Sequence, residues 1–200
     1  MKIPAVKIRG LKKSFDKVQA LDGVDLTIKQ GEFLGLLGPN GAGKTTTINI
    51  LTGLVIRQEG ITEILGKDTV KDYRFTRSKI GIAAQELSID WFFPVEKLLL
   101  FHAGYYGMPA NQAKERVSKI IEKLGLGEKR NTRLRQLSGG MKRRYQLAKA
   151  LIHDPEIIIL DEPTAGVDVE LRHELWDYLR QLHGEGKTCL LYTSPSPRDS

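Results

Sequence analysis

Apolar residues fall into two patterns along the chain, and both patterns predict β-strands. Some runs alternate apolar and polar positions, as in strands with one buried face. Others are almost continuously apolar, as in parallel strands that are buried on both faces. The alternating runs are 3–15, 24–28 and 60–66, the continuous runs are 32–37 and 157–160, and a further short strand is expected at 80–84.

Apolar positions spaced three or four residues apart predict helices in the rest of the chain. The two longest, 95–106 and 110–124, follow each other without a strand pattern between them, so we expect a helical subdomain at about 86–137. Other helices are expected at 46–51, from Ser138 onward and at 169–183. The alternation of strands and helices elsewhere predicts an α/β fold, with the first strands forming an antiparallel β patch beside a parallel sheet.

A glycine-rich stretch follows the first continuous run. Its sequence, GPNGAGKTT at 38–46, matches the pattern G-x-x-x-x-G-K-[ST] of a phosphate-binding loop between a strand and a helix. The glycines let successive backbone N–H groups turn toward an anion, Lys44 can reach the β- and γ-phosphates, and Thr45 offers a hydroxyl to Mg²⁺. The candidates for nucleotide binding are Gly38, Pro39, Asn40, Gly41, Ala42, Gly43, Lys44, Thr45 and Thr46.

Two acids follow the second continuous run. Successive strand residues point to opposite sides, so Asp161 and Glu162 can take different tasks. Asp161 suits binding of Mg²⁺, and Glu162 suits orientation of an attacking water; the alternative is a surface acid pair. Gln85, which follows the strand at 80–84, either touches the metal ion or the water, or is an ordinary surface glutamine.

A second pair of glycines predicts another anion site. Ser138, Gly139 and Gly140 open a helix, with Ser138 as its N-cap. The free N–H groups and the positive end of the helix dipole attract an anion there. Because one ATP has a single γ-phosphate, two such sites on one chain indicate that ATP is shared between two chains.

Aromatic residues at two places have two interpretations each. Phe15, which precedes the phosphate loop, either stacks on a nucleotide base or packs between strands. Trp91, Phe92 and Phe93, at the head of the helical region, either pack within a loop or form a docking surface for a partner helix. Both groups are therefore candidates for contact with a ligand or a partner.

Composition narrows the class of protein. The 200 residues are 40% hydrophobic and 28% charged, which suits one globular domain with a proper core. No run of about 18 apolar residues is present and no apolar export segment opens the sequence, so we expect a cytoplasmic protein without a membrane span. The net charge of +7 is spread along the chain, and nucleic acid is not an expected partner.

Together these motifs resemble those of ATP-binding cassette (ABC) ATPases. GPNGAGKTT looks like Walker A, Gln85 like the Q-loop, LSGGM like the signature, IIILDEP like Walker B, and AGVD, which ends at Asp168, like the D-loop. The resemblance covers residues 3–188 and implies a P-loop NTPase (RecA-like) core within one ABC ATPase domain over 1–188. LSGGMKRR with LDEPTAGVD is similar to the bacterial ABC-2 type exporter ATPases.

The resemblance also implies roles for residues. It implies a head-to-tail ATPase dimer, with ATP between Walker A of one subunit and the signature of the other, and Glu162 as the catalytic carboxylate. It implies an integral membrane permease that docks near Trp91, Phe92 and Phe93, on the inner face of the bacterial cell membrane. Beyond Walker A, the residues implied for the nucleotide are Phe15, Gln85, Ser138, Gly139, Gly140 and Asp168, and those for Mg²⁺ are Thr45, Gln85 and Asp161.

The residues at 189–200 depart from the family pattern. The string CLLYTSPSPRD matches, codon by codon, the translation of a transposase-type sequencing adapter, so we interpret 189–200 as a non-native tail. The family pattern requires a switch histidine in this region, and none of the four histidines, His102, His153, His173 and His183, stands there. We therefore expect these 200 residues to bind ATP but to hydrolyse it slowly.

Three functions remain for comparison. We favour an ATPase subunit, with ATP and Mg²⁺ as cofactors, that energises export of an unknown substrate through a separate ABC-2 type permease. The alternative is a soluble ABC ATPase acting on nucleic acid or the ribosome, but the sequence contains no second cassette, coiled-coil insertion or zinc-binding cysteines. A nucleotide-binding regulator without turnover is disfavoured because Glu162 is intact.

Overall fold

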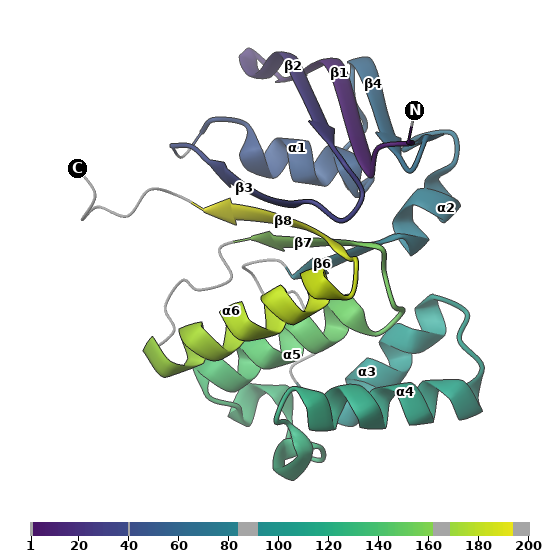
Figure 1. Cartoon of the computed structure of the whole chain (residues 1–200), viewed down its shortest axis with the longest axis vertical. Coiled ribbons are helices and arrows are strands. Elements are labelled where there is room, and N and C mark those ends of the chain that lie inside the picture. Colours follow the sequence, from purple (N-terminus) through teal and green to yellow (C-terminus); the bar gives the residue numbers. More distant parts are fainter. Residues whose placement is uncertain (1, 40, 84–91, 162–168, 194–200) are drawn as a thin grey trace.

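The computed structural model describes residues 2–39, 41–83, 92–161 and 169–193, which form two sheets with helices (Figure 1). An antiparallel sheet has the strand order β2-β1-β4-β5, and a parallel sheet has the order β3-β8-β7-β6, which confirms the predicted fold class. The strands are β1 (Val6–Phe15), β2 (Val18–Ile28), β3 (Phe33–Leu37), β4 (Glu59–Ile64), β5 (Lys67–Asp68), β6 (Ile80–Ala83), β7 (Ile157–Asp161) and β8 (Thr188–Thr193). The α-helices are α1 (Lys44–Leu51), α2 (Tyr73–Ser78), α3 (Val95–Tyr105), α4 (Ala110–Lys123), α5 (Gly139–Leu151) and α6 (Val169–Gly184).

The parallel sheet separates two hydrophobic cores, because its strands are buried on both faces. Ile157 and Ile159 of β7 join a core with β1, β2, β4 and α1, whereas Ile158 and Leu160 join a core with α3, α4, α5 and α6. Figure 1 shows the first group above the parallel sheet and the four helices below it. Consequently α1 and α5 pack on opposite faces of one sheet.

Several elements differ from the sequence-based prediction. β2 begins at Val18 rather than near position 24, and its first half is largely exposed and pairs with β1 across shifts of register, which weakens the apolar alternation. α2 was not predicted, because a six-residue helix with Thr76 as its buried residue carries no periodic apolar pattern. α1 begins at Lys44 rather than at position 46.

The described residues between β6 and α5 form helices and turns, as predicted for this region. α4 turns one face inward, with Ala113, Val117, Ile120 and Ile121 buried at helical spacing. The two ends of the region meet where Pro94 and Arg133 form an isolated β-bridge. The bounds of the helical subdomain stay a prediction. In the parts of the chain that are described, no helix has both the length and the apolar character needed to cross a membrane.

β8 lies in the middle of the parallel sheet, between β3 and β7. Its residues Cys189, Leu190, Leu191 and Tyr192 are buried alternately in the two cores, so this segment supplies the apolar residues that a central strand needs. Burial raises the pKa of the Cys189 thiol to about 11, which keeps it protonated at neutral pH. The Tyr192 hydroxyl is buried without a hydrogen-bond partner among the described residues, at a cost of about 1–3 kcal/mol. The interpretation of 189–200 as a non-native tail stays a prediction.

Candidate nucleotide-binding site

The carboxyl ends of β3, β8 and β7 lie at one edge of the parallel sheet. Leu36 pairs with Tyr192 and Tyr192 pairs with Asp161, so these three residues lie in a row across the sheet. The glycine-rich loop begins directly after Leu37, and Asp161 is the last residue of β7. Ligands of open α/β sheets bind outside this kind of edge. The structure thus brings the predicted phosphate loop and the predicted metal carboxylate to one edge.

Lys44 folds back over the glycine-rich loop. Its ammonium donates to the backbone oxygens of Gly38 and Pro39, the second at 2.9 Å. The amide of Ala42 also donates to the Pro39 oxygen, at 3.2 Å. A phosphate oxygen carries more negative charge than these carbonyls and is a stronger acceptor for an ammonium. The loop carbonyls therefore hold the Lys44 ammonium where it can exchange them for the oxygens of a bound phosphate.

Gly43 sets the path of the loop into α1. Its φ is +81°, and a Cβ at this position would lie 2.4 Å from Leu21 Cδ2 and 2.6 Å from the backbone oxygen of Ala20. β2 therefore packs directly against the loop, a constraint that the motif pattern does not contain. Thr45, one residue into α1, is exposed, which leaves its hydroxyl accessible to a metal ion.

Arg143 joins α5 to the end of β7. This buried side chain donates from Nη1 to Gln146 Oε1 at 2.8 Å and from Nη2 to the backbone oxygen of Asp161 at 3.0 Å. Sequence reasoning missed this role, because Arg143 stands in the basic run 142–144, which has the composition of a surface. The contact holds the backbone at Asp161, the last described residue before Glu162.

The predicted second anion site is the N-terminus of α5. Ser138 is its N-cap, and the Ser138 Oγ accepts a hydrogen bond from the amide of Met141 at 3.3 Å. Ser138 and Gly139 are both exposed. Because α5 and α1 pack on opposite faces of the parallel sheet, this N-terminus and the phosphate loop lie on different sides of it (Figure 1).

The predicted aromatic contacts divide into exposed and packed rings. Phe15 ends β1 with 45% of its surface exposed, and the Lys13 ammonium lies 5.1 Å from its ring centre. Phe92 is 66% exposed, whereas Phe93 is half-buried and meets the Phe101 ring edge to face at 5.7 Å. Phe15 and Phe92 are therefore accessible to a base or a partner, and these roles stay predictions.

Some predicted site residues lie outside the described residues: Asn40, Gln85, Trp91, Glu162 and Asp168. Within the described ranges, no group of three or more His, Cys, Asp or Glu side chains is arranged to hold a metal ion. One hydroxyl from Thr45 and one carboxylate from Asp161 nevertheless fit Mg²⁺, which usually takes few protein ligands together with phosphate oxygens and waters.

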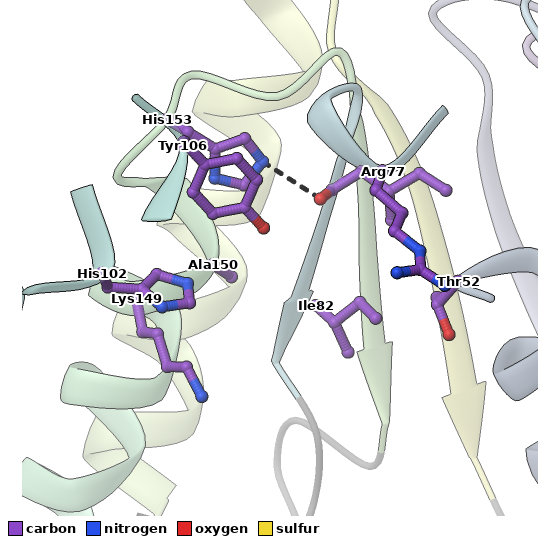
Figure 2. Close-up of a pocket in the computed structure, with 9 residues that line it drawn as sticks. Thr52, Arg77, Ile82, His102, Tyr106, Lys149, Ala150 and His153 are labelled. Atoms are coloured by element: carbon purple, nitrogen blue, oxygen red, sulfur yellow. Dashed lines mark hydrogen bonds between the residues drawn. The ribbon is translucent and has the colours of Figure 1, made fainter. Parts of the chain in front are cut away.

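A separate cavity of about 210 Å³ lies between β6, α3 and α5 (Figure 2). His153 donates from Nε2 to the backbone oxygen of Ile80 at 3.0 Å, and its ring stacks on Tyr106 with 3.6 Å between ring centres. His102 meets the Tyr106 ring edge to face at 5.4 Å. Neither histidine was placed at the switch position, and the cavity that they share was not predicted from the sequence.

The cavity histidines predict a loss of stability in acid. Burial lowers the pKa of His102 and of His153 to about 4, and the neighbouring Lys149 adds to this effect at His102. The charges of Arg116 and Lys187 also lower the pKa of His153, whereas its bond to Ile80 and the Asp154 carboxylate oppose the shift. Between pH 6.5 and 4 the unfolded chain therefore binds protons that the folded chain does not, and stability falls as pH falls.

We expect the free energy of unfolding to be lower at pH 5 than at pH 7.5 by about 2 kcal/mol from this pair, after allowance for solvent screening. Urea denaturation at the two pH values measures the difference. The double variant His102→Gln/His153→Gln should lose most of this pH dependence, whereas His173→Gln, at an exposed position, should keep it. An unchanged pH dependence in the double variant would contradict the assignment.

Comparison with known sequences gives one family. A family model described as ABC transporter matches residues 21–165. The chain is 41% identical over 189 residues to the Nod factor export ATP-binding protein I of Paraburkholderia xenovorans (strain LB400), which covers 94% of this chain and 62% of that protein. The protein of the same name from Rhizobium sp. (strain N33) gives the same values. The chain thus spans about 62% of the length of these relatives.

Solved structures give the same fold. The dimeric structure of MJ0796, a bacterial ABC transporter cassette, has a TM-score of 0.86 and 29% identity, and the match covers 94% of this chain and 87% of that one. The cbiO1 protein of Clostridium perfringens, part of the ABC transporter complex cbiONQ, has a TM-score of 0.83 and 29% identity, with 96% of this chain and 79% of that one covered. MJ0796 bound to ADP and Pi has a TM-score of 0.85 and 28% identity over 94% and 87% of the two chains.

Proposed function

Because this chain belongs to the ABC transporter family, we propose that it binds and hydrolyses ATP as the nucleotide-binding subunit of an exporter whose permease is a separate membrane protein. The observation that carries the proposal is the row of Leu36, Tyr192 and Asp161 across the parallel sheet. This row puts the start of the phosphate loop and the last residue of β7 at the same edge of the parallel sheet, where one nucleotide can contact both.

Each residue at this edge has a task that follows from its chemistry. Lys44 exchanges the Gly38 and Pro39 carbonyls for phosphate oxygens, and the loop amides donate to the same phosphates. Thr45 and Asp161, together with Gln85, hold Mg²⁺, which neutralises charge on the β- and γ-phosphates when it is bound. Glu162 follows Asp161 in the chain and orients the attacking water.

The second anion site completes the nucleotide site of another subunit. Ser138 and Gly139 are exposed at the N-terminus of α5, on the face of the sheet opposite to α1. A head-to-tail dimer brings this N-terminus of one chain to the γ-phosphate bound by the loop of the other. In such a dimer Phe15 stacks on the base and Asp168 lies near the nucleotide. The dimeric cassette MJ0796 supports this arrangement by analogy.

Export is the direction that the relatives favour. Both relatives described above are Nod factor export ATP-binding proteins, and we propose the same direction here for a substrate that the permease selects. The ABC-2 type of that permease is our inference from LSGGMKRR and LDEPTAGVD. Trp91, Phe92 and Phe93 contribute to its docking surface. The subunit then works on the cytoplasmic face of the membrane.

Replacing Lys44 with alanine tests nucleotide binding. The change removes charge-assisted hydrogen bonds to phosphate, each worth about 1.5–3 kcal/mol, so we expect the Kd for ATP to rise about thirtyfold. Isothermal titration with Mg²⁺-ATP measures this change. Lys119→Ala, which removes an exposed lysine from α4, is the matched control and should leave the Kd unchanged. Equal affinity of Lys44→Ala and the parent protein would refute the assignment of the loop.

A further inference from the structure

The segment 67–79 presents a surface that is both basic and aromatic. It consists of β5, the turn that follows β5, and α2. Its exposed basic residues are Lys67, Lys71, Arg74 and Arg77. Among them lie three partly exposed apolar side chains: Val70 (41%), Tyr73 (43%) and Phe75 (39%). A surface that combines cations with exposed rings suits a partner that is anionic and partly apolar.

Neighbouring acids do not neutralise the positive charge of this surface. Asp68 is paired with Arg57 at 2.6 Å, and the less exposed Lys79 is paired with Glu156 at 2.6 Å. Among the described residues, none of the four exposed basic side chains forms an ion pair. Asp72 is the remaining acid of the segment, so the surface keeps a positive net charge.

The surface is fixed from below. The Oδ1 atom of Asp68 accepts hydrogen bonds from the amides of Val70 and Lys71, at 2.9 and 3.0 Å, which holds the turn between β5 and α2. Thr76 is 1% exposed and anchors α2 in the interior. Arg77 donates from Nη2 to the backbone oxygen of Gly53 at 2.7 Å. A surface that is ordered in advance loses little conformational entropy when it binds.

Cations lie over both exposed rings of α2. The guanidinium groups of Arg74 and Arg77 lie 5.7 and 5.3 Å from the centre of the Tyr73 ring. The Lys79 ammonium lies 5.4 Å from the centre of the Phe75 ring. A nucleic-acid base needs a free ring face for stacking and would have to displace these cations. A lipid headgroup needs no ring face, because its phosphate binds the cations while the rings lie at headgroup level, so the geometry favours lipid.

α2 lies away from the nucleotide-binding site. It ends at Ser78, just before β6, and therefore lies at the amino ends of the parallel strands. The phosphate loop and Asp161 lie at the carboxyl ends of these strands. Figure 1 shows α2 on the side opposite to the arrowheads of β3 and β8. A partner bound to α2 thus leaves the nucleotide site open.

We propose that the segment 67–79 binds the phosphate headgroups of anionic lipids and holds this chain against a membrane surface. The exposed cations contact lipid phosphates, while Val70, Tyr73 and Phe75 enter the headgroup layer. Each basic residue near an anionic surface strengthens binding about fivefold. The inference goes beyond the proposed function, because it assigns a membrane contact to this chain itself and requires neither the permease nor a nucleotide.

Flotation with protein-free lipid vesicles tests the proposal. Vesicles of phosphatidylcholine with about 30% phosphatidylglycerol are compared with vesicles of phosphatidylcholine alone, at about 0.1 M salt and without nucleotide. We expect the parent protein to bind the anionic vesicles at least about tenfold more tightly than the neutral ones. Because salt screens the attraction between cations and lipid phosphates, this binding should weaken as the salt concentration rises.

A charge variant assigns the contact to this surface. Lys71→Gln/Arg74→Gln should lower the affinity for anionic vesicles about 25-fold and reduce its dependence on salt. The matched control, Lys119→Gln/Arg180→Gln, removes one exposed lysine and one exposed arginine from α4 and α6. This control should bind the anionic vesicles within about threefold of the parent protein.

An apolar variant tests the contribution of the exposed side chains. Val70→Ser/Phe75→Ser should weaken binding to anionic vesicles about tenfold, because less apolar surface enters the headgroup layer. Its dependence on salt should match that of the parent protein, since every cation is retained. Thermal melting of each variant verifies that the fold is kept.

Three results would overturn the proposal. The first is equal binding of the parent protein to anionic and neutral vesicles, and the second is an equal loss of binding in the charge variant and its control. The third is tighter binding of polyuridylate RNA than of anionic vesicles at equal phosphate concentration, which would assign the surface to nucleic acid. The Kd for ATP, measured on the same variants, should stay unchanged and tests the proposed function separately.

Discussion

Replacing Gly43 with alanine should abolish productive nucleotide binding and destabilise the domain. The backbone at Gly43 has a φ of +81°, which costs an alanine about 1–2 kcal/mol by itself. The added Cβ would also lie 2.4 Å from Leu21 Cδ2 and 2.6 Å from the Ala20 oxygen. The Ala20 oxygen belongs to β2 and cannot rotate away, so either β2 or the loop must move.

The left-handed backbone and the clash with β2 together set the expected losses of stability and of ATP affinity. We expect the free energy of unfolding to fall by about 3 kcal/mol and the Kd for ATP to rise by at least about a hundredfold, because the loop amides no longer converge on the phosphates. Gly107→Ala is the matched control: its φ is +74°, but a Cβ there meets nothing within 4 Å. That variant should lose about 1 kcal/mol and bind ATP normally.

Urea denaturation and ATP titration of the same two variants separate the effect of the contact with β2 from that of the left-handed backbone. If Gly43→Ala and Gly107→Ala lose equal stability and both bind ATP, the contact with β2 has no effect, and only the left-handed backbone matters. If Gly43→Ala loses stability but binds ATP as tightly as the parent protein, the loop does not require this geometry for phosphate binding.

The phosphate site was predictable because its signals are local. The motif at 38–46 and the acids at 161–162 each follow an apolar run, and a buried parallel strand needs no distant partner to be recognised. Both runs are parallel strands in the structure, β3 and β7, and each pairs with β8. In contrast, the contact of Gly43 with β2 and the bond from Arg143 to Asp161 join residues far apart in sequence. No single-sequence pattern encodes such contacts.

The cavity between β6, α3 and α5 was missed for the same reason. Arg77 comes from α2, His102 from α3 and Lys149 from α5, and each alone has the sequence context of a surface residue. Only the packing of the three helices against β6 collects them around one space. α2 itself was not predicted, since its single buried residue gives no periodic signal. Such a grouping of side chains becomes visible only once the tertiary packing is known.

Replacing Glu162 with glutamine should separate ATP binding from hydrolysis. Glu162 directly follows Asp161, the last residue of β7, whose backbone oxygen is held by Arg143 at 3.0 Å. A glutamine keeps the size and can still bind water, but it cannot accept a proton or carry the negative charge that polarises the attacking water. We expect the rate of hydrolysis to fall about a thousandfold, with the Kd for ATP unchanged.

The same change should stabilise the ATP-bound dimer, because the two anion sites stay occupied when the γ-phosphate is not released. Single-turnover phosphate release measures the rate of the chemical step. Light scattering with and without Mg²⁺-ATP measures the molar mass of the protein and so detects the dimer. Glu156→Gln is the matched control: it precedes β7 at the opposite end of the strand, where it pairs with Lys79. This control should hydrolyse ATP at the parent rate. Phosphate release by Glu162→Gln within about threefold of the parent would show that another group activates the water.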